Sequence, residues 1–249
     1  MIDNFTYDEY RAVLELAYKH NVITSFNRYR EGYKDNQLIL RHDIDFSVEM
    51  AYEVAKINYE MNVDATFFFM ITNSHYNCLD KKNRTLIKCI ANMGFEVGLH
   101  FDPTLYADCD FAKHAKFESN IIESITGVRV ESISLHNPSI HGQMFNIIGY
   151  NNAYDAKWFS DEVYLSDSRK MFRNKNIKDF LTDKTKSVKQ VLFHPIHYNT
   201  TALTYTETFA ELVVKEIETF DEELLIANEN YFDQAKNKRI ISILKDRKV

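Results

Sequence analysis

The chain has 249 residues, which suits one large domain or two small ones and is enough to bury a core without disulfide or metal staples. Hydrophobic residues make up 45% of it and charged residues 27%, and the 6 Gly and 3 Pro are too few for a disordered chain or a flexible linker. A formal net charge of −6 without a long basic run argues against a nucleic-acid partner.

Helical and strand-like patterns alternate along the first half of the chain. Thr6 is an expected N-cap, and an apolar stripe between Met50 and Met61 repeats at spacings of 4, 3 and 4 residues. Gly94 and Gly127 each mark the end of a helix. The predicted helices cover residues 6–20, 50–61, 81–93 and 111–126, and the predicted strands cover residues 37–42, 64–70, 95–100 and 130–136.

The second half of the chain continues the alternation less clearly. Strands that alternate with helices favour a mostly parallel sheet. No internal repeat, low-complexity tract or linker interrupts the pattern, so residues 1–249 are predicted to form one domain. The predicted elements are weak strands at 152–156 and 162–168, a strand at 189–198, and helices at 209–220 and 222–246.

Cysteine usage and the N-terminus predict a reducing compartment. Cys78, Cys89 and Cys109 are odd in number and form no CxxC pair, so neither a disulfide framework nor a zinc-thiolate site is expected. Residues 1–10 lack the basic and apolar regions of a signal peptide, and no run approaches the roughly 18 apolar residues of a membrane span. We therefore expect a cytoplasmic protein without a membrane span.

Polar residues recur where the predicted strands end. The segments HDID, LHFD, LHNP, SDS and HPIH each follow a strand-like run. In α/β barrels the carboxyl ends of the strands build the active site. The sequence therefore predicts a functional site at this edge of the sheet.

Asp43 and Asp45 end the first strong strand. They lie two residues apart, so strand geometry would point both side chains to one side. Two close carboxylates repel each other, and a cation between them relieves that repulsion. One carboxylate can bind the ion while the other accepts a proton from water. The alternative is a pair of solvated loop acids.

Histidines end several of the other strands. His100, His136 and His194 each close a separate strand-like run, Asp102 follows two residues after His100, and His42 precedes the aspartate pair. A single histidine is usually a packed or surface residue, but several at strand ends indicate a site. Histidine and aspartate together suit zinc, or another borderline divalent ion, at an open catalytic site. The histidines in helix or loop contexts are read as background: His20, His75, His114 and His141.

Other catalytic and binding signatures are missing or ambiguous. No GxSxG elbow, P-loop or GxGxxG motif occurs, and the cysteines have no local nucleophile signature. Trp158, Phe159 and Phe172 could line a sugar groove, but we favour ordinary core packing for them.

With these motifs the chain resembles a divergent member of the polysaccharide deacetylases, the chitooligosaccharide deacetylase homology domain of carbohydrate esterase family 4. The resemblance implies a distorted (β/α) barrel with about seven parallel strands. It also implies an enzyme that removes acetyl groups from N- or O-acetylated sugars with a divalent metal. The matching segments follow the family's order: LRHDIDFS (40–47), ATFFF (65–69), GFEVGLHFD (94–102), SLHNPS (134–139), LSDSRKMF (165–172) and VLFHPIHY (191–198).

The resemblance implies a role for each matching residue. It makes Asp43 the catalytic base and Asp45 a metal ligand. It makes His194 the general acid, oriented by Asp167. The backbone N–H of Ser139 would stabilise the oxyanion that forms on the substrate.

The chain departs from the family pattern at two positions. A second histidine ligand is expected four residues after His100, where this chain has Thr104. An arginine that orients the base is expected where this chain has His136. His136 could replace the missing ligand, which gives a zinc site of Asp45, His100 and His136. Asp102 is the other candidate ligand.

The function implied by the resemblance is hydrolysis of an acetamido or acetoxy group on a sugar. By family analogy the substrate is an intracellular intermediate of surface polysaccharide synthesis. A sugar-binding descendant that has lost catalysis is the alternative, and Thr104 motivates it. A metal-dependent hydrolase of a non-sugar amide is a third reading. No feature of the sequence points to an oligomeric state.

Overall fold

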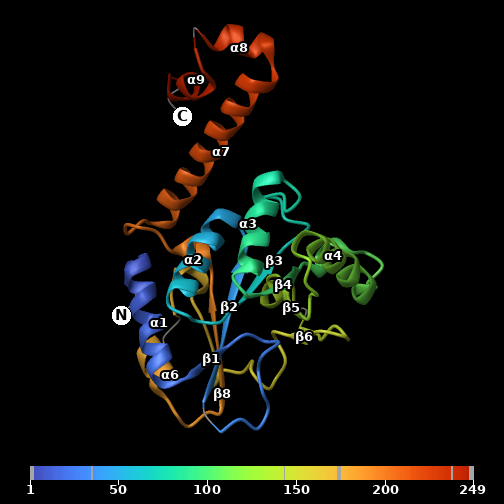
Figure 1. Ribbon diagram of the computed structural model, residues 1–249, viewed down its shortest axis with the longest axis vertical. Coiled ribbons are helices and arrows are strands. Elements are labelled where there is room, and N and C mark those ends of the chain that lie inside the picture. The colour runs from blue at the N-terminus through green and yellow to red at the C-terminus, as the bar shows by residue number, and fades with distance from the viewer. Residues whose placement is uncertain (1–2, 35, 143, 173–174, 237, 247–249) are drawn as a thin grey trace. The chain divides into compact units, whose positions relative to one another are not determined.

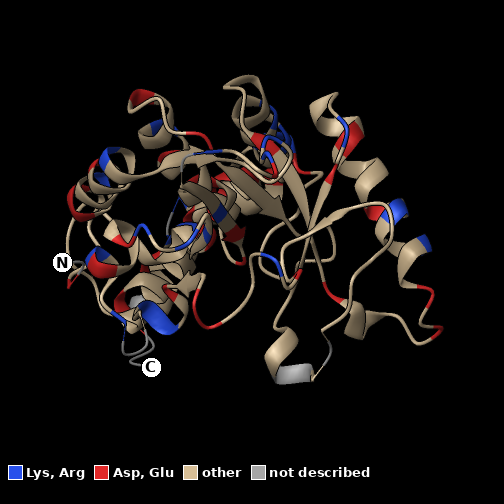
Figure 2. Cartoon of the chain, turned by 90° about the horizontal axis from the view of Figure 1, so that it is seen from below, with Lys and Arg blue, Asp and Glu red and all other residues tan. Residues whose placement is uncertain are grey.

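The chain divides into two compact units, Met1–Ala202 and Leu203–Val249. All the predicted site residues lie in the first unit. Acidic and basic residues are interspersed along the chain (Figure 2), as the absence of a long basic run in the sequence leads one to expect. The computed structural model describes residues 3–34, 36–142, 144–172, 175–236 and 238–246.

A parallel sheet forms the centre of the first unit (Figure 1). Its strands are β1 (Val22–Thr24), β2 (Gln37–Ile44), β3 (Thr66–Phe69), β4 (Glu96–Phe101), β5 (Ser132–Leu135), β6 (Asn151–Asn152), β7 (Tyr164–Ser166) and β8 (Val188–Phe193). Seven of them run in the order β6-β5-β4-β3-β2-β8-β7, and β1 pairs with β2 beside this path. Every pairing among the described residues is parallel. The sheet curls into a half-barrel whose outermost strands are β6 and β7.

The side chains of β2 alternate between two buried faces. Leu38 and Leu40 belong to the main core, which the sheet shares with the helices. Ile39 points the other way, into a smaller cluster with Phe68 and Trp158. All residues of β2 are buried, as expected of a strand at the centre of a parallel sheet. The odd-numbered residues of β2 therefore face the inside of the half-barrel.

Helices of the first unit pack around this sheet, with α1 against α6, α2 against α3, and α3 against α4 (Figure 1). They are α1 (Tyr7–His20), α2 (Val48–Glu60), α3 (Lys81–Asn92), α4 (Phe111–Thr126), α5 (Pro138–His141) and α6 (Ile177–Thr182). The predicted N-cap Thr6 accepts a hydrogen bond from the Glu9 N–H, and the Glu9 carboxylate accepts one from the Thr6 N–H. Gly127 ends α4 at a φ of 76°, a conformation that favours glycine.

The described residues of the second unit form three helices, α7 (Tyr205–Ala227), α8 (Glu229–Ala235) and α9 (Ile240–Asp246). Asn228 ends α7 and caps α8, where its side chain accepts the Tyr231 N–H at 2.9 Å. The buried Asp221 carboxylate joins two of the helices, because it accepts hydrogen bonds from the Tyr231 hydroxyl and from Arg239 Nε. Among the described residues, no helix has the length and apolar character needed to span a membrane.

The predicted distorted (β/α) barrel is confirmed, and the element boundaries differ where the local signals are weak. β1 is too short to show a pattern and was not predicted. In place of the strand expected at 152–156 the structure has the two-residue strand β6, because the chain turns after Asn152. β8 ends at Phe193, before Pro195 opens the 3₁₀ turn η3 (Pro195–His197). The helix expected at 222–246 is interrupted at Asn228. The prediction of one domain over residues 1–249 stays a prediction.

Candidate active site

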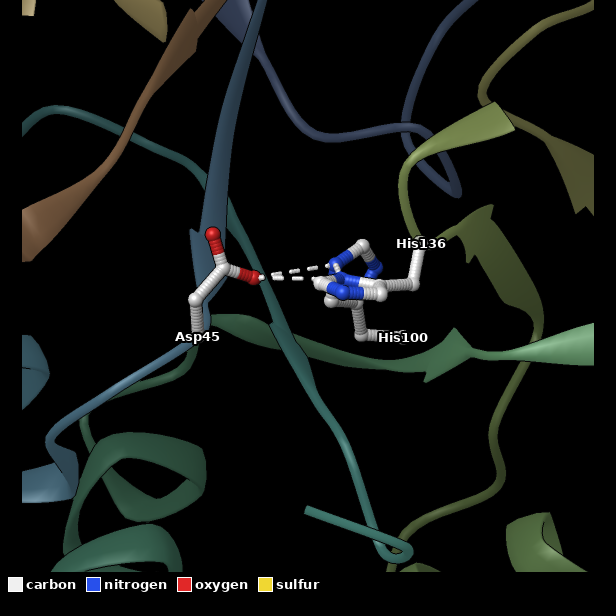
Figure 3. A group of neighbouring side chains, drawn as sticks. All are labelled: Asp45, His100 and His136. Atoms are coloured by element: carbon white, nitrogen blue, oxygen red, sulfur yellow. Dashed lines mark hydrogen bonds and ion pairs between the residues drawn. The ribbon is translucent and has the colours of Figure 1, made fainter. Parts of the chain in front are cut away.

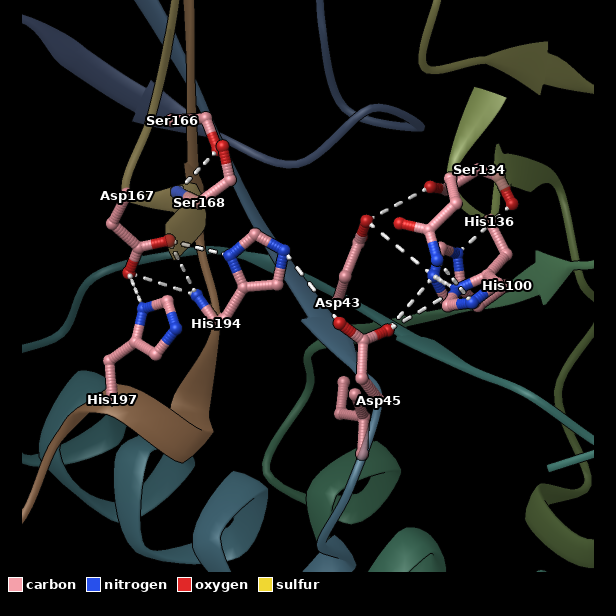
Figure 4. Close-up of polar contacts among 12 residues, drawn as sticks. Asp43, Asp45, His100, Ser134, His136, Ser166, Asp167, Ser168, His194 and His197 are labelled. Atoms are coloured by element: carbon pink, nitrogen blue, oxygen red, sulfur yellow. Dashed lines mark hydrogen bonds and ion pairs between the residues drawn. The ribbon is translucent and has the colours of Figure 1, made fainter. Parts of the chain in front are cut away.

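The carboxyl ends of the strands bring the predicted residues together (Figure 4). Asp45 directly follows β2, and His100 lies near the end of β4. His136, Asp167 and His194 directly follow β5, β7 and β8. Because parallel strands end at the same edge of a sheet, residues far apart in the chain meet there. The predicted residues thus meet at one edge of the sheet.

Asp45, His100 and His136 form a compact group (Figure 3). Asp45 Oδ1 lies 3.1 Å from His100 Nε2 and 3.6 Å from His136 Nδ1. The two ring nitrogens are 3.1 Å apart. One divalent ion with bonds of roughly 2.0–2.2 Å to each atom requires such a grouping. The structure therefore brings together the three residues that the sequence proposes as ligands.

Hydrogen bonds determine which atoms face the centre of this group. His100 Nδ1 lies 3.2 Å from the Ser134 carbonyl, which can only accept, so the lone pair is on Nε2. Asn137 Nδ2 lies 2.8 Å from His136 Nε2. When Nε2 carries the ring proton, the Asn137 amide presents its oxygen there instead, and the lone pair on Nδ1 then faces Asp45. Asp45 Oδ1 is buried and has no hydrogen-bond partner among the described residues. A buried carboxylate oxygen without a donor, facing two imidazole nitrogens, fits a divalent cation.

The charges in this group favour a cation as well. Burial raises the pKa of the Asp45 carboxyl, but the nearby His100 and His136 rings outweigh that and hold it well below its usual range. Burial lowers the pKa of His136, but Asp45 outweighs that and raises it. A proton on His136 would compete with an ion for this site, so ion binding weakens as the pH falls.

Asp43 lies beside this group and is held by a buried arginine. Arg41 Nε donates to Asp43 Oδ1 at 2.9 Å, and Arg41 Nη2 donates to Asp43 Oδ2 at 2.7 Å. The Ser134 hydroxyl donates to Asp43 Oδ2 at 3.2 Å. Burial raises the pKa of the Asp43 carboxyl, but the Arg41 guanidinium outweighs that and lowers it. Asp43 is therefore an ionised carboxylate next to the ligand group.

Asp167 positions His194 on the other side of Asp45 (Figure 4). Asp167 Oδ1 lies 2.6 Å from His194 Nδ1, and both carboxylate oxygens accept the His194 backbone N–H at 3.0 Å. Burial lowers the pKa of His194, but Asp167 outweighs that and raises it to about 9. The protonated ring presents Nε2 at 3.8 Å from Asp45 Oδ2. This geometry fits a histidine that gives up a proton.

Asp167, His194 and His197 also lie close enough together to hold an ion. However, Asp167 Oδ1 and Oδ2 already face N–H groups of His194, and Oδ2 lies 3.3 Å from His197 Nδ1. The Asp45 oxygen, by contrast, has no donor among the described residues. The group around Asp45 therefore fits a cation better than this second group does.

The remaining predicted residues have less central positions. Asp102, the alternative ligand, turns into its own loop, where its Oδ1 accepts the Thr104 N–H at 3.0 Å and the Thr104 hydroxyl at 2.6 Å. The exposed Thr104 thus stabilises a turn at the position where a histidine is expected. Ser139 lies exposed in the first turn of α5, and its part in holding an oxyanion stays a prediction.

Two residues at this edge of the sheet, Arg41 and His197, were not predicted as site residues. Arg41 could have been found from the alternation of side chains along a strand. It lies two residues before Asp43 and therefore points to the same face of β2. The resemblance implies an arginine at the position of His136, whereas here the guanidinium that holds Asp43 comes from β2. His197 is the second histidine of the HPIH segment, but nothing in the sequence indicates that it faces Asp167.

His42 points to the opposite face of β2 and does not join the site. Its ring stacks on Phe67 with ring centres 4.4 Å apart, and its Nε2 lies 2.7 Å from the Tyr10 hydroxyl. That hydroxyl donates to Asn58 Oδ1. Burial lowers the pKa of His42 to about 3, so it is a neutral core residue. Of the histidines read as background, the structure describes the backbone of His141 but not its side chain.

The three candidate groove aromatics pack within the fold, as we favoured. Trp158 is 1% exposed and belongs to the inner cluster. Phe159 packs edge-on against Tyr154, and Phe172 stacks with Phe5. They therefore add no evidence for a sugar groove.

No family model and no curated protein matches the chain, but solved structures do. One is a mutant of a CE4 family pseudoenzyme with restored activity, with 19% identity, a TM-score of 0.44, and coverage of 75% of this chain and 64% of that one. Another is PdaA of Bacillus subtilis, a family 4 carbohydrate esterase, with 17% identity, a TM-score of 0.43 and coverage of 82% of both chains. The chitin deacetylase of Colletotrichum lindemuthianum has 18% identity, a TM-score of 0.44 and coverage of 72% and 81%.

The first of these structures is described as a CE4 family pseudoenzyme and the second as a family 4 carbohydrate esterase. The wild-type pseudoenzyme comes from Bacillus anthracis. This chain spans less than two thirds of the length of the mutant pseudoenzyme, 64% of it. The roles of individual residues depend on the geometry of this chain itself.

Proposed function

We propose that this chain is a metal-dependent carbohydrate deacetylase, a divergent member of carbohydrate esterase family 4. One observation carries the proposal: a donor set of Asp45, His100 and His136 lies between a carboxylate held by arginine and a histidine held by carboxylate. Those two flanking residues, Asp43 and His194, supply a base and an acid on two sides of one site.

Asp45, His100 and His136 would hold the divalent ion, with zinc as the expected ion. When bound, the ion would polarise the acyl oxygen of the substrate and lower the pKa of water at the site. A donor set of one carboxylate and two imidazoles leaves room for such ligands in an open catalytic site. Asp45 Oδ1 fits this use, because among the described residues nothing donates to it.

Asp43 and His194 would carry the proton transfers. As water attacks the acetyl carbon, Asp43 accepts the proton that the water loses. As the C–N bond breaks, His194 donates its Nε2 proton to the leaving nitrogen, which departs as an amine while acetate forms. Asp167 contacts His194 Nδ1 and thereby keeps His194 Nε2 protonated and directed into the site. The Ser139 N–H is the proposed donor to the carbonyl oxygen as negative charge develops there.

The substrate in this proposal is an N-acetylated sugar, an intracellular intermediate of surface polysaccharide synthesis. The resemblance alone suggests this substrate and the cytoplasmic location that it requires. The acid in the site agrees with an amide substrate, because an amine is a poor leaving group unless it is protonated.

Acetate release from a panel of substrates tests the proposal. The purified chain is stripped with a chelator and resupplied with zinc. It is then incubated with a nucleotide-linked acetamido sugar, a lipid-linked one and an acetylated oligosaccharide. We expect acetate and free amine in equal amounts from at least one substrate, and only with the ion present. If the zinc-loaded chain releases none while it binds one of the sugars, a sugar-binding protein without catalysis replaces the proposal.

A further inference from the structure

Asp43 and Asp45 are both aspartates, so their residue type does not determine which of them binds an ion and which accepts a proton. Both are aspartates at the end of β2, and the strand geometry directs both toward the same side. Asp43 Oδ2 lies only 3.9 Å from His100 Nε2. A modest movement of its side chain would make Asp43 a second carboxylate ligand for the same ion.

Arg41 engages both oxygens of Asp43 and neither oxygen of Asp45. Its Nε and Nη2 form a two-pronged contact with the Asp43 carboxylate at 2.9 and 2.7 Å. The exposed fractions of the two side chains are 0% and 3%, so water does not compete for these bonds. A guanidinium in this arrangement fixes both the position and the orientation of a carboxylate.

The guanidinium is itself held in place from several strands. Arg41 Nη1 donates to Gln190 Oε1 at 3.1 Å, and the Gln190 amide donates in turn to two backbone carbonyls. Arg41 Nη2 also contacts the hydroxyls of Ser134 and Tyr154, and its charge lies 4.7 Å from the centre of the Tyr154 ring. Arg41 therefore cannot move toward solvent without breaking contacts to three other strands or loops.

We propose that Arg41 is a positioning residue that gives the two aspartates different roles, by keeping Asp43 out of metal coordination and leaving Asp45 as the only carboxylate ligand. This inference rests on the proposed function, since it presumes an ion at Asp45, His100 and His136. Two carboxylates with two neutral histidines would cancel the charge of a divalent ion. One carboxylate leaves it a stronger electrophile and leaves Asp43 free to accept a proton.

A double-mutant cycle on zinc affinity tests the inference. The proteins are the wild type, Arg41→Lys, Asp43→Asn and the double variant, and affinity is measured by competition with a chromophoric chelator. Lysine keeps the charge but cannot bind both carboxylate oxygens as a fork. We expect Arg41→Lys to bind zinc about tenfold more tightly. Changes to residues that hydrogen-bond to metal ligands alter metal affinity by a factor of about this size. In the Asp43→Asn background the same change should have no effect.

Cobalt(II) in place of zinc gives a second readout that needs no turnover. A freed Asp43 oxygen raises the coordination number, so the visible absorption of the cobalt protein should weaken in Arg41→Lys and not in the double variant. Turnover should fall by about 10²-fold in Arg41→Lys, the lower end of the range for loss of a general base. Asp43→Asn should abolish the dependence of turnover on Arg41.

Two further variants keep the test decisive. If Arg41→Lys does not fold, Tyr154→Phe removes only the 3.0 Å contact to Arg41 Nη2 and should tighten zinc in the same direction by less. Arg28→Lys is the matched control. Arg28 pairs with Asp64 away from the site, at 3.0 Å, and its change should leave zinc affinity and the cobalt spectrum unaltered.

The outcomes separate this inference from the proposed function. Unchanged or weaker zinc binding in Arg41→Lys, or in Tyr154→Phe if the former is unfolded, overturns the inference. So does an equal effect of Arg41→Lys in the Asp43→Asn background. A wild type that hydrolyses no acetylated sugar but shows the zinc coupling overturns the proposed function alone.

Discussion

His136 is the residue on which the metal assignment depends most. Its Nδ1 faces Asp45 and His100, so it can complete a set of three protein ligands. Replacing it with alanine leaves two. We expect His136→Ala to weaken zinc binding by at least about 10–100-fold, since even residues behind the ligands have effects of that size. Equilibrium dialysis with elemental analysis measures the stoichiometry and the affinity.

Asp102→Ala is the matched control, because Asp102 is the other acid that the sequence offers as a ligand. Its Oδ1 is occupied by Thr104, so the variant should bind zinc as the wild type does. The reverse pattern, with binding lost in Asp102→Ala and kept in His136→Ala, would contradict the assignment.

Asp167 sets the pH range over which His194 can act as an acid. Its carboxylate raises the pKa of His194 to about 9 against the opposing effect of burial. A general acid must be protonated, so turnover falls as the pH rises through that pKa. Asp167→Asn removes the charge and should move the basic limb of the kcat profile to lower pH. An unshifted basic limb in an otherwise active variant would mean that another group is the acid.

Among the site residues, those that end strands could be predicted from the sequence more readily than those inside strands. Asp43, Asp45 and His194 could be placed because polar residues after apolar runs stand out. Arg41 did not stand out, because its partners Gln190 and Tyr154 come from distant segments. Only the folded sheet shows that its charge is paired.

Strands deliver these side chains, and their close packing leaves little freedom. Gly98 on β4 faces Phe68 on β3, where an added Cβ would meet the Phe68 ring at 2.5 Å and the Ser132 carbonyl at 2.9 Å. We expect Gly98→Ala to lower the free energy of unfolding by about 1–3 kcal/mol, the usual range for overpacking. Thermal and denaturant unfolding measure the change.

Phe68→Leu in the same chain provides the internal check. A smaller side chain at this position relieves the crowding, so Gly98→Ala should destabilise the Phe68→Leu background by less than the wild type. Equal destabilisation in both backgrounds would show that the Phe68 ring is not the obstacle.

Elements were predictable where periodicity and capping agree. The helix after Thr6 and the helix before Gly127 have both a stripe and a cap, and the structure contains them. β1 has three residues, and β6 has two, so neither shows alternation. The break at Asn228 was missed because asparagine is tolerated inside a helix unless its side chain caps the next one.

The two compact units raise the question of how much of the chain the site requires. All the site residues and both hydrophobic clusters lie in Met1–Ala202. We expect a chain that ends at Ala202 to unfold cooperatively and to bind zinc with the affinity of the full chain. Calorimetry and the chelator competition measure this. A truncated chain that does not fold would support one domain over residues 1–249.

The order of the strands in the sheet could not be predicted from the periodicity of the sequence. β2 pairs with β8, where Gln37 lies opposite Val188, and no local pattern connects such distant segments. Alternation of strands and helices predicted a parallel sheet. The resemblance supplied the barrel, because a sequence pattern fixes which face of a strand is buried but not which strand lies beside it.

Asp43→Asn is the most direct test of whether a catalytic base lies beside the metal site without being one of its ligands. The variant keeps the size of the side chain and its contact with Arg41 through the amide oxygen. We expect one zinc per chain, an unchanged fold and turnover reduced by about 10²–10⁴-fold on the acetylated sugar that the wild type hydrolyses. Loss of the zinc, or turnover close to that of the wild type, would contradict this expectation.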